Sequence, residues 1–570
     1  MTALLYLLAL APATLLAYTV APSATVLNQL AAIAGWGLVV ASALMKCPAA
    51  QWRPLGALVA ALLLYGAFQA SGLVSGAVPV SMGAPTLMAV TAATAVCWAG
   101  ACAGRAANEP MLGFAWALLI VGGANVAISL VQVFLPEMAD GVVIARSGLP
   151  GRAVGNLRQP NHLSSLALWS TVAVVPLVEC GRLSRRAAVL LFAFFVFSIE
   201  LSASRTGMVG VCVLAAWGAL DRRLTRFTRA LLVSGVLIYA VGWGGMTLWA
   251  TEGRHTFGAA ARLSEADVSG SRFGIWANTL ALVRAVPLTG VGVGEFNFAW
   301  TLSAFPGRPT AFFDHTHNVV LQMLVECGVV IGAAVVALFG VALWQAFRRA
   351  WSLSGVGGVS HRTAFVMVLL MALHSQFEYP LWYAYFLLPT AWAWGYCLGA
   401  PPEQQTQSPR SALRYLGVVA GAAMVVGALW AAQQYVVVSH IFEPVPGDER
   451  PLAERIEAGR KSLLFGHHAD YAAVTVAEHP STAWASFATA PHYLLDTRLM
   501  IAWATAFAER GDLDRARYIA QRLREFKKED AAEFFAPCMQ QPAPTPLPFQ
   551  CEQPTRPIDW REFRDPALYR

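Results

Sequence analysis

Two histidines stand two residues apart in the segment Asp314-His315-Thr316-His317-Asn318, directly before a long apolar run. An imidazole titrates near neutral pH and can accept a proton from a hydroxyl group, so this segment is a candidate for a general base. A metal site with Asp314 as a further ligand is the alternative. A spacing of two fits a helix face poorly and no third strong ligand stands nearby, so we do not expect a metal site here.

Two arginines occur where an anion could be bound. Arg205 lies in the tight turn SASRTG between two apolar runs, and Arg272 lies in SRFGIW within a long polar stretch. An arginine at the end of a membrane span can simply reach lipid phosphate. The backbone donors of a Ser/Thr/Gly turn can also hold an anion, which favours a diphosphate role for Arg205.

The segment GRAVGNLRQPNH ends in polar side chains just before an apolar run. Gln159, Asn161 and His162 would stand at membrane depth, where an unpaired polar group costs several kcal/mol. Asn161 is as well suited to cap the following helix as to bind a ligand. For Gln159 the pattern favours a ligand role.

A fourth polar cluster, HSQFEYPLWY, separates two apolar runs. Trp382, Tyr383 and Tyr385 are typical of the aromatic belt at a membrane surface. For Glu378 and Tyr379, at the turn itself, a functional and a structural role fit equally well.

The glycine-rich segment GVGVGEF, from Gly290 to Phe296, resembles a phosphate-binding loop only superficially. It lacks the Lys-Ser/Thr ending of such a loop. We interpret it as a place where backbones approach closely.

These segments are positioned by membrane helices. Of 570 residues, 57% are hydrophobic and only 13% charged, and the mean hydropathy is +0.53. About thirteen apolar runs are long enough to cross a bilayer, and we read the first one (Leu4 to Val20) as a retained helix. The net charge of +7 comes from short basic clusters between the runs, so nucleic acid is not an expected partner.

The basic clusters also orient the chain. With a cytoplasmic N-terminus, Arg185, Arg186, Arg222 and Arg223 all fall inside, as the positive-inside rule requires. The connections 135–161 and 250–317 and the tail from residue 436 then lie outside. These outer connections and turns nevertheless carry arginines, among them Arg146, Arg152, Arg158, Arg205, Arg254, Arg262 and Arg272.

The composition changes sharply from Glu443 onward, which predicts a separate helical domain at 436–570 after a membrane domain at 1–435. Met500 to Phe526 has the pattern of two amphipathic helices, with Gly511 ending the first and Asp512 capping the second, as in a tetratricopeptide hairpin. Cys538 and Cys551 lie in a Pro-rich polar segment, where an oxidising compartment would let them pair. The other cysteines are expected to be packing residues: Cys47, Cys97, Cys102, Cys180, Cys212, Cys327 and Cys397.

Taken together, QPNH, SRTG, SRFGIW with GVGVGEF, and HTHNVVLQMLVECG resemble the superfamily of O-antigen ligases, O-antigen polymerases and bacterial protein O-oligosaccharyltransferases, over residues 140–400. QPNH, HSQFEYPLWYAYF and the long tail are most similar to the PglL-type protein O-oligosaccharyltransferases.

The resemblance implies an all-α polytopic membrane protein of the GT-C-like kind, with a large periplasmic loop, in the bacterial inner membrane and with its active site facing the periplasm. The implied reaction transfers a glycan en bloc from undecaprenyl-diphosphate to Ser/Thr hydroxyls of periplasmic proteins such as pilin, without a metal or other cofactor and with inversion. The implied site has His317 as the catalytic residue and Arg205, Arg272, Gln159 and Tyr379 as donor-binding residues. Supporting residues would be Asn161, His162, Asn318, Glu378, Asp314 and His315.

Three other functions fit parts of the pattern. A ligase that transfers glycan to lipid A core uses nearly the same residues and is the first alternative, and a polymerase is the second. A transporter would be expected to carry charged residues in mid-span, whereas here they collect at the outer ends.

Overall fold

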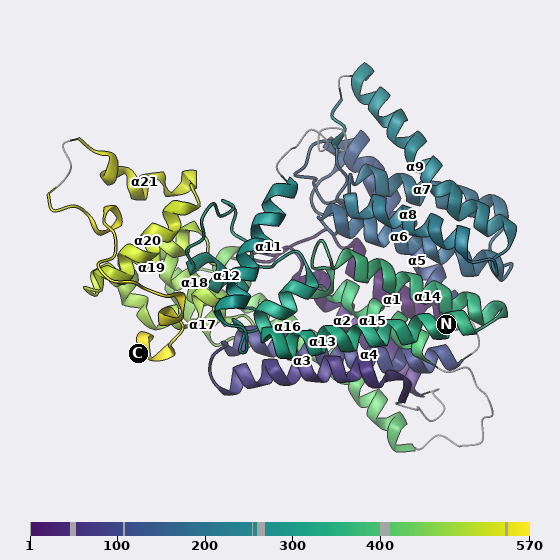
Figure 1. The fold of residues 1–570 in the computed structure, drawn as a ribbon, viewed down its shortest axis with the longest axis horizontal. Coiled ribbons are helices and arrows are strands. Elements are labelled where there is room, and N and C mark those ends of the chain that lie inside the picture. The colour runs from purple at the N-terminus through teal and green to yellow at the C-terminus, as the bar shows by residue number, and fades with distance from the viewer. Residues whose placement is uncertain are drawn as a thin grey trace. The chain divides into compact units, whose positions relative to one another are not determined.

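The computed structural model describes residues 2–45, 53–106, 109–253, 255–258, 268–399, 411–541 and 545–570. Cys47, Arg254 and Arg262 lie outside the described residues. Within these ranges the regular structure is helical, apart from one isolated bridge between Val20 and Ser23 (Figure 1).

Nine helices among the described residues are long and apolar enough to cross a membrane. This confirms a polytopic, all-α protein. Their bounds are α2 (Val26–Met45), α3 (Gly56–Val74), α4 (Val80–Arg105), α5 (Glu109–Phe134), α6 (Pro160–Glu179), α9 (Arg226–Gly253), α13 (Val319–Ser352), α14 (Gly355–His374) and α16 (Ser411–Phe442).

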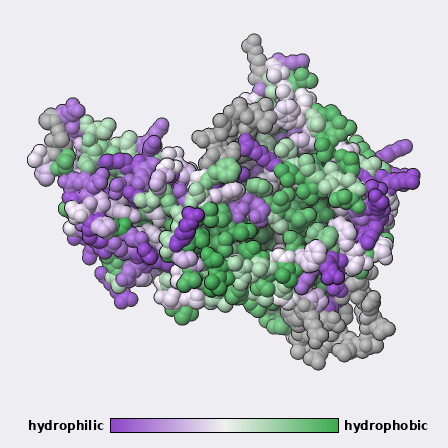
Figure 2. All heavy atoms as spheres, in the orientation of Figure 1, coloured by the Kyte–Doolittle hydropathy of each residue, from purple (hydrophilic) through white to green (hydrophobic). Residues whose placement is uncertain are grey.

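Helices also form over the other four predicted runs, but these are shorter than 18 residues. They are α1 (Thr2–Leu15), α7 (Arg185–Leu201), α8 (Arg205–Leu220) and α15 (Ala384–Leu398). The number of thirteen crossings therefore stays a prediction. Apolar side chains are exposed on the flanks of the long helices, as Leu237, Val241 and Leu248 of α9 show, and Figure 2 shows hydrophobic residues spread over such surfaces. A bilayer is the solvent that suits them.

The chain divides into two compact units. The first comprises residues 1–60, 91–266 and 338–430, and the second comprises residues 61–90, 267–337 and 431–570. The core of the first unit is built around buried aromatic rings. Trp392 of α15 packs within 4.6 Å of Phe114 of α5 and 5.1 Å of Tyr6 of α1, measured between ring centroids. Such tilted ring pairs add to the stabilisation from burial alone.

The second unit joins the long polar stretch after α9 to the tail. Phe298, in α12 (Phe296–Leu302), stacks on His492 with ring centroids 4.8 Å apart, and Glu295 accepts hydrogen bonds from the same imidazole at 2.8 and 2.9 Å. The backbone N–H of Leu495 donates to the Asn297 side chain at 2.7 Å. Residues of α11 (Val268–Ala285) and the tail helices fill the same core. The stretch after α9 and the tail, which lie on either side of the composition boundary at residue 436, therefore share one core in this unit.

The tail contains helical hairpins. Its helices are α17 (Leu452–Arg460), α18 (Gly466–Val476), α19 (Thr497–Glu509), α20 (Leu513–Glu525) and the short α21 (Ala532–Phe535). Gly511, with φ of 82°, follows the end of α19, and the Asp512 side chain accepts from the Arg515 N–H to cap α20. The predicted stop and cap of this hairpin are confirmed.

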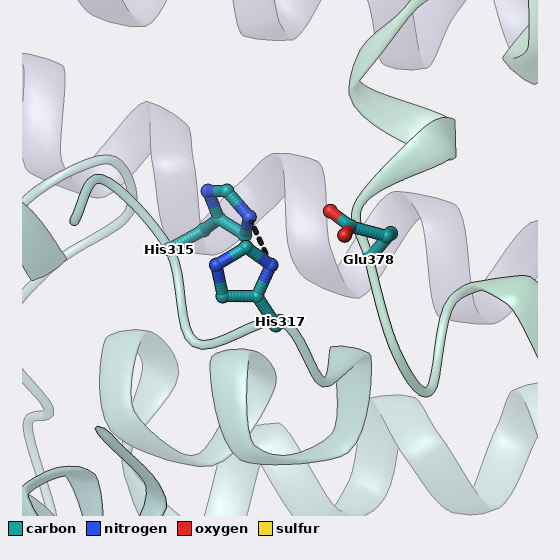
Figure 3. A group of neighbouring side chains, drawn as sticks. All are labelled: His315, His317 and Glu378. Atoms are coloured by element: carbon teal, nitrogen blue, oxygen red, sulfur yellow. Dashed lines mark hydrogen bonds between the residues drawn. The ribbon is translucent and has the colours of Figure 1, made fainter. Parts of the chain in front are cut away.

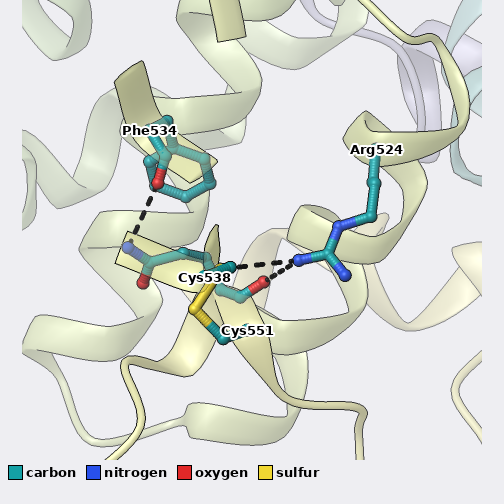
Figure 4. Close-up of a disulfide and its surroundings, with 5 residues drawn as sticks. Arg524, Phe534, Cys538 and Cys551 are labelled. Atoms are coloured by element: carbon teal, nitrogen blue, oxygen red, sulfur yellow. Dashed lines mark hydrogen bonds between the residues drawn. A yellow bond between two sulfur atoms is a disulfide. The ribbon is translucent and has the colours of Figure 1, made fainter. Parts of the chain in front are cut away.

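Cys538 and Cys551, the pair proposed from the sequence, form a disulfide in the structure (Figure 4). Arg524 of α20 donates to the backbone carbonyl of Gln550 at 2.8 Å, and the Gln550 side chain donates to the Phe534 carbonyl at 3.2 Å. These bonds hold the Pro-rich end against α20 and α21.

One cysteine expectation is wrong. Cys102, in the last turns of α4, is disulfide-bonded rather than a simple packing residue. Five described cysteines are free, as expected: Cys97, Cys180, Cys212, Cys327 and Cys397.

Candidate functional site

Three of the polar motifs meet inside the first unit. Asn161, at the start of α6, donates to the Glu378 carboxylate at 3.2 Å and accepts from the Ser204 hydroxyl at 2.6 Å. The Ser164 hydroxyl in turn donates to Ser204 at 3.0 Å. This chain of side-chain bonds joins QPNH, SASRTG and the turn after α14, three segments up to 217 residues apart.

The helix cap at QPNH is Gln159, and not Asn161, for which the sequence left capping and ligand binding equally open. Gln159 is the N-cap of α6, and its side-chain oxygen accepts from the His162 N–H at 2.9 Å. Pro160 occupies the first turn, which fixes the cap on the preceding residue. Asn161 therefore points its amide into the polar network instead of capping. A ligand role for Gln159 stays a prediction, because only its oxygen is used by the cap.

Arg205 begins α8 on a tightly held turn. Ser204 caps this helix by accepting from the Gly207 N–H at 3.0 Å, and Ala203 has a positive φ of 52°. The Ser204 N–H also donates to the Ser202 hydroxyl at 3.2 Å. The N-terminus of a helix favours anions, so the backbone and the guanidinium of Arg205 both suit a phosphate group.

The aromatic residues of the fourth motif pack around His162. Tyr385 bonds to the His162 ring nitrogen Nδ1 at 3.2 Å, and the Tyr383 ring lies 4.6 Å away from the imidazole. The Tyr383 hydroxyl donates to the hydroxyl of Tyr379 at 3.2 Å. His162 and Glu378 are buried, whereas Tyr379 is partly exposed. The structure thus gives His162 a packing role and leaves Tyr379 accessible.

The histidine segment belongs to the second unit and forms a chain of hydrogen bonds. His315 bonds through Nδ1 to the Asp314 carboxylate. Its Nε2 bonds to Nδ1 of His317 at 3.0 Å (Figure 3). Desolvation by burial opposes ionisation of the Asp314 carboxyl, but the hydrogen bond from His315 and the neighbouring polar and charge interactions together hold its pKa below the ordinary value.

An ionised Asp314 determines the proton positions on two neutral imidazoles. Asp314 can only accept, so His315 carries its proton on Nδ1 and accepts at Nε2. His317 must then donate from Nδ1, and its lone pair lies on Nε2. When Nε2 takes up a proton, the positive charge is shared along the chain toward Asp314. This arrangement is suited to a general base, because the carboxylate stabilises the imidazolium that forms.

The backbone around His317 is held in a strained form by its neighbours. His317 has φ of 55°, in the left-handed region that a residue with a side chain rarely adopts. Gln322 of α13 accepts from the Thr316 N–H at 2.8 Å, and Trp276 of α11 donates to the Thr316 carbonyl at 3.0 Å. Such strain persists only where surrounding contacts determine it, as at active sites.

The glycine-rich segment is linked to the histidine loop through Glu326 and Gln322 of α13. Glu326 of α13 accepts from the Gly294 N–H at 2.9 Å and from the Gln322 side chain at 2.9 Å. A methyl group on Gly290 would lie 2.3 Å from the Glu326 carbonyl, and one on Gly328 would lie 2.3 Å from the Leu288 carbonyl. The predicted close approach of two backbones is confirmed.

Arg272 lies on α11 one turn before Trp276. Residues four apart share a helix face, so Arg272 stands on the face of α11 that contacts the histidine loop. Its side chain is partly buried.

The predicted site residues therefore fall into two groups, one in each unit. The first holds Gln159, Asn161, His162, Arg205, Glu378 and Tyr379, and the second holds Arg272, Asp314, His315, His317 and Asn318. Ser164, Ser204 and Gln322 were missed. Gln322 had a signal, since Gln322 and Glu326 are polar residues four apart in an apolar run.

Comparison with known families matches three parts of the chain. Residues 188–336 match the family described as O-antigen ligase, and residues 153–177 match the protein glycosylation ligase family. Residues 363–536 match the family described as virulence factor membrane-bound polymerase, C-terminal. These matches show that the chain is similar to the O-antigen ligases and polymerases.

Two relatives come from Acinetobacter baylyi. A general O-oligosaccharyltransferase is 27% identical over 280 residues, which cover 47% of this chain and 48% of the relative. A ComP-specific O-oligosaccharyltransferase is 25% identical over 313 residues, or 53% of each chain. The chain thus spans about half the length of the curated relatives it matches. Within the superfamily it is similar to the PglL-type protein O-oligosaccharyltransferases, which confirms the resemblance seen in its motifs.

Proposed function

We propose that this protein is an oligosaccharyltransferase that transfers a glycan en bloc from undecaprenyl-diphosphate to a serine or threonine hydroxyl of a protein. The relatives' names support transfer of an oligosaccharide to oxygen. The observation that carries the proposal is the Asp314–His315–His317 chain of hydrogen bonds, which links the His317 imidazole to a carboxylate.

In the proposed reaction, the acceptor hydroxyl oxygen attacks the anomeric carbon of the first sugar. The bond from that carbon to the diphosphate oxygen breaks, and its electron pair leaves with the diphosphate. His317 takes the hydroxyl proton on Nε2. Direct displacement inverts the anomeric configuration, and no metal or cofactor is required.

The leaving group develops negative charge, which fixed cations stabilise best where water is excluded. Arg205 and Arg272 would each bind diphosphate oxygens, because a guanidinium matches phosphate geometry with two parallel donors. Gln159 and Tyr379 would orient sugar or diphosphate oxygens. Asn161 and Glu378 would hold the Arg205 turn in place through Ser204.

We also propose that the protein lies in the bacterial inner membrane with the histidine loop, the connection 135–161 and the tail on the periplasmic side. The basic loops support this orientation. Cysteine-accessibility labelling of intact cells tests it. Labelling of the tail only from the cytoplasm would contradict the topology.

A ligase to lipid A core is the second candidate function, since residues 188–336 match the family described as O-antigen ligase. A polymerase is the third, since residues 363–536 match a family described as a polymerase. The decisive experiment gives purified protein in nanodiscs the lipid-linked donor with one of three acceptors: a pilin-type protein, lipid A core, or a second lipid-linked glycan. Transfer to protein supports the proposal, and transfer to either of the others alone overturns it.

A further inference from the structure

A cavity of about 770 Å³ opens in the first unit, where α5 ends and the connection 135–159 begins. Its size lies in the range of small-ligand sites. Six of the residues that line it carry the argument: Phe134, Glu137, Arg146, Ser147, Trp249 and His255.

One part of the lining is aromatic. His255 stacks on Trp249 with ring centroids 4.3 Å apart and planes 12° apart, and the Phe134 ring meets Trp249 edge-on at 5.1 Å. Trp249 is only partly buried. Flat aromatic surfaces pack well against the C–H faces of sugar rings, while Glu137, Arg146 and Ser147 supply acceptors and donors for sugar hydroxyls.

The connection that forms the cavity is held in shape by buried amides. The Gln132 side chain accepts from the N–H of Val154 at 2.9 Å and of Gly155 at 2.8 Å, and donates to the Ala145 carbonyl. Asn156 accepts from the Ala145 N–H at 2.9 Å. A cavity organised in this way before a ligand arrives avoids the entropy cost of ordering a loop on binding.

The same connection is tied to the proposed diphosphate site. Gly151 lines the cavity, and the next residue, Arg152, donates through Nε to the Ser202 carbonyl at 3.1 Å. The Ala153 N–H donates to the Leu201 carbonyl at 2.8 Å. Ser202 opens the turn that carries Arg205. The connection that lines the cavity is therefore bonded directly to the turn that carries Arg205, in the same unit.

We infer that this cavity is a glycan subsite, which binds sugar rings of the lipid-linked donor beyond the one that is transferred first. The inference rests on the proposed function for the identity of the donor. A polyprenyl chain is the poorer occupant, because Glu137 and Arg146 would have to lose water without gaining a polar partner. An acceptor peptide is a different occupant that the test distinguishes.

The test measures binding and transfer separately, with purified protein in nanodiscs. The binding probe is the free oligosaccharide released by mild acid from the lipid-diphosphate pool of the native membranes, measured by calorimetry. Trp249→Ala and Arg146→Gln should each weaken its binding about tenfold, the size expected for a well-packed contact residue. Trp344→Ala is the matched control. Trp344 is 59% exposed on α13 and stacks on Phe347, away from the cavity residues.

In transfer assays, Trp249→Ala should lower kcat/KM more for the full-length donor than for a donor that carries a single sugar. Unchanged binding of the free oligosaccharide in both variants, or competition for the cavity by the acceptor peptide instead, overturns the inference. If Trp249→Ala fails to fold, Arg146→Gln still tests whether the cavity binds the glycan, because Arg146 is exposed and its replacement should not disturb folding. If the protein binds the oligosaccharide in a way that depends on Arg146 but shows no transfer activity, the proposed function is wrong and the glycan subsite stands.

Discussion

Replacing His317 by glycine separates a catalytic role from a structural one. The left-handed backbone at His317 costs about 1–2 kcal/mol for a residue with a side chain, and glycine removes that cost. The substitution also removes the hydrogen bond to His315, worth about 1 kcal/mol. The bonds that hold the turn, from Gln322 and Trp276, go to the backbone of Thr316 and remain. The free energy of unfolding of the His317→Gly variant should therefore lie within about 1 kcal/mol of the wild-type value.

Transfer should fall in the same variant by about 10²-fold or more, because general-base catalysis contributes roughly 10²- to 10⁴-fold. The measurements are thermal unfolding in detergent and initial rates with lipid-linked donor and acceptor protein. The His315→Ala variant should transfer glycan about tenfold more slowly, because His315 orients His317 and does not touch the substrate. His479→Ala is the control, because that side chain is 70% exposed in the tail. A His317→Gly protein that keeps its activity, or that loses more than about 3 kcal/mol of stability, would refute the reasoning.

Three further outcomes are expected. Arg205→Lys and Arg272→Lys should each lower transfer at least about tenfold while membrane insertion persists, because lysine keeps the charge but loses the two-pronged geometry; wild-type rates in both would mean that the diphosphate is bound elsewhere. Treatment with EDTA should leave the transfer rate unchanged, and inhibition that added metal reverses would end the metal-free mechanism. Glu295→Ala should lower the stability of the second unit by about 1–3 kcal/mol, because it leaves the buried His492 ring without its acceptor, and an unchanged melting temperature would contradict this.

Part of the site could be predicted from the sequence because it depends on local patterns. The apolar runs located the helices, and Gly511 with Asp512 located a turn in the tail. For Asn161 the sequence left capping of α6 and ligand binding equally open, although Pro160 in the first turn is a local signal for a cap at Gln159.

Other features depend on distant contacts and left no local signal. The spacing of two did not predict a hydrogen bond between the two histidine rings, which form one in a segment where His317 has a positive φ. The bond from Asn161 to Glu378 links residues 217 apart. The change of composition at Glu443 suggested a separate domain, yet Phe298 and His492 share one core.

That shared core has a consequence for how the protein is made. Glu295 leaves the ribosome 197 residues before His492, which corresponds to about 10–40 s at ordinary rates of synthesis. During this interval the apolar side chains of α12 have no partner from the tail. A chain that stops short of the tail would therefore expose Phe298 and Trp300. Quality-control proteases would degrade such chains before they could act on any substrate.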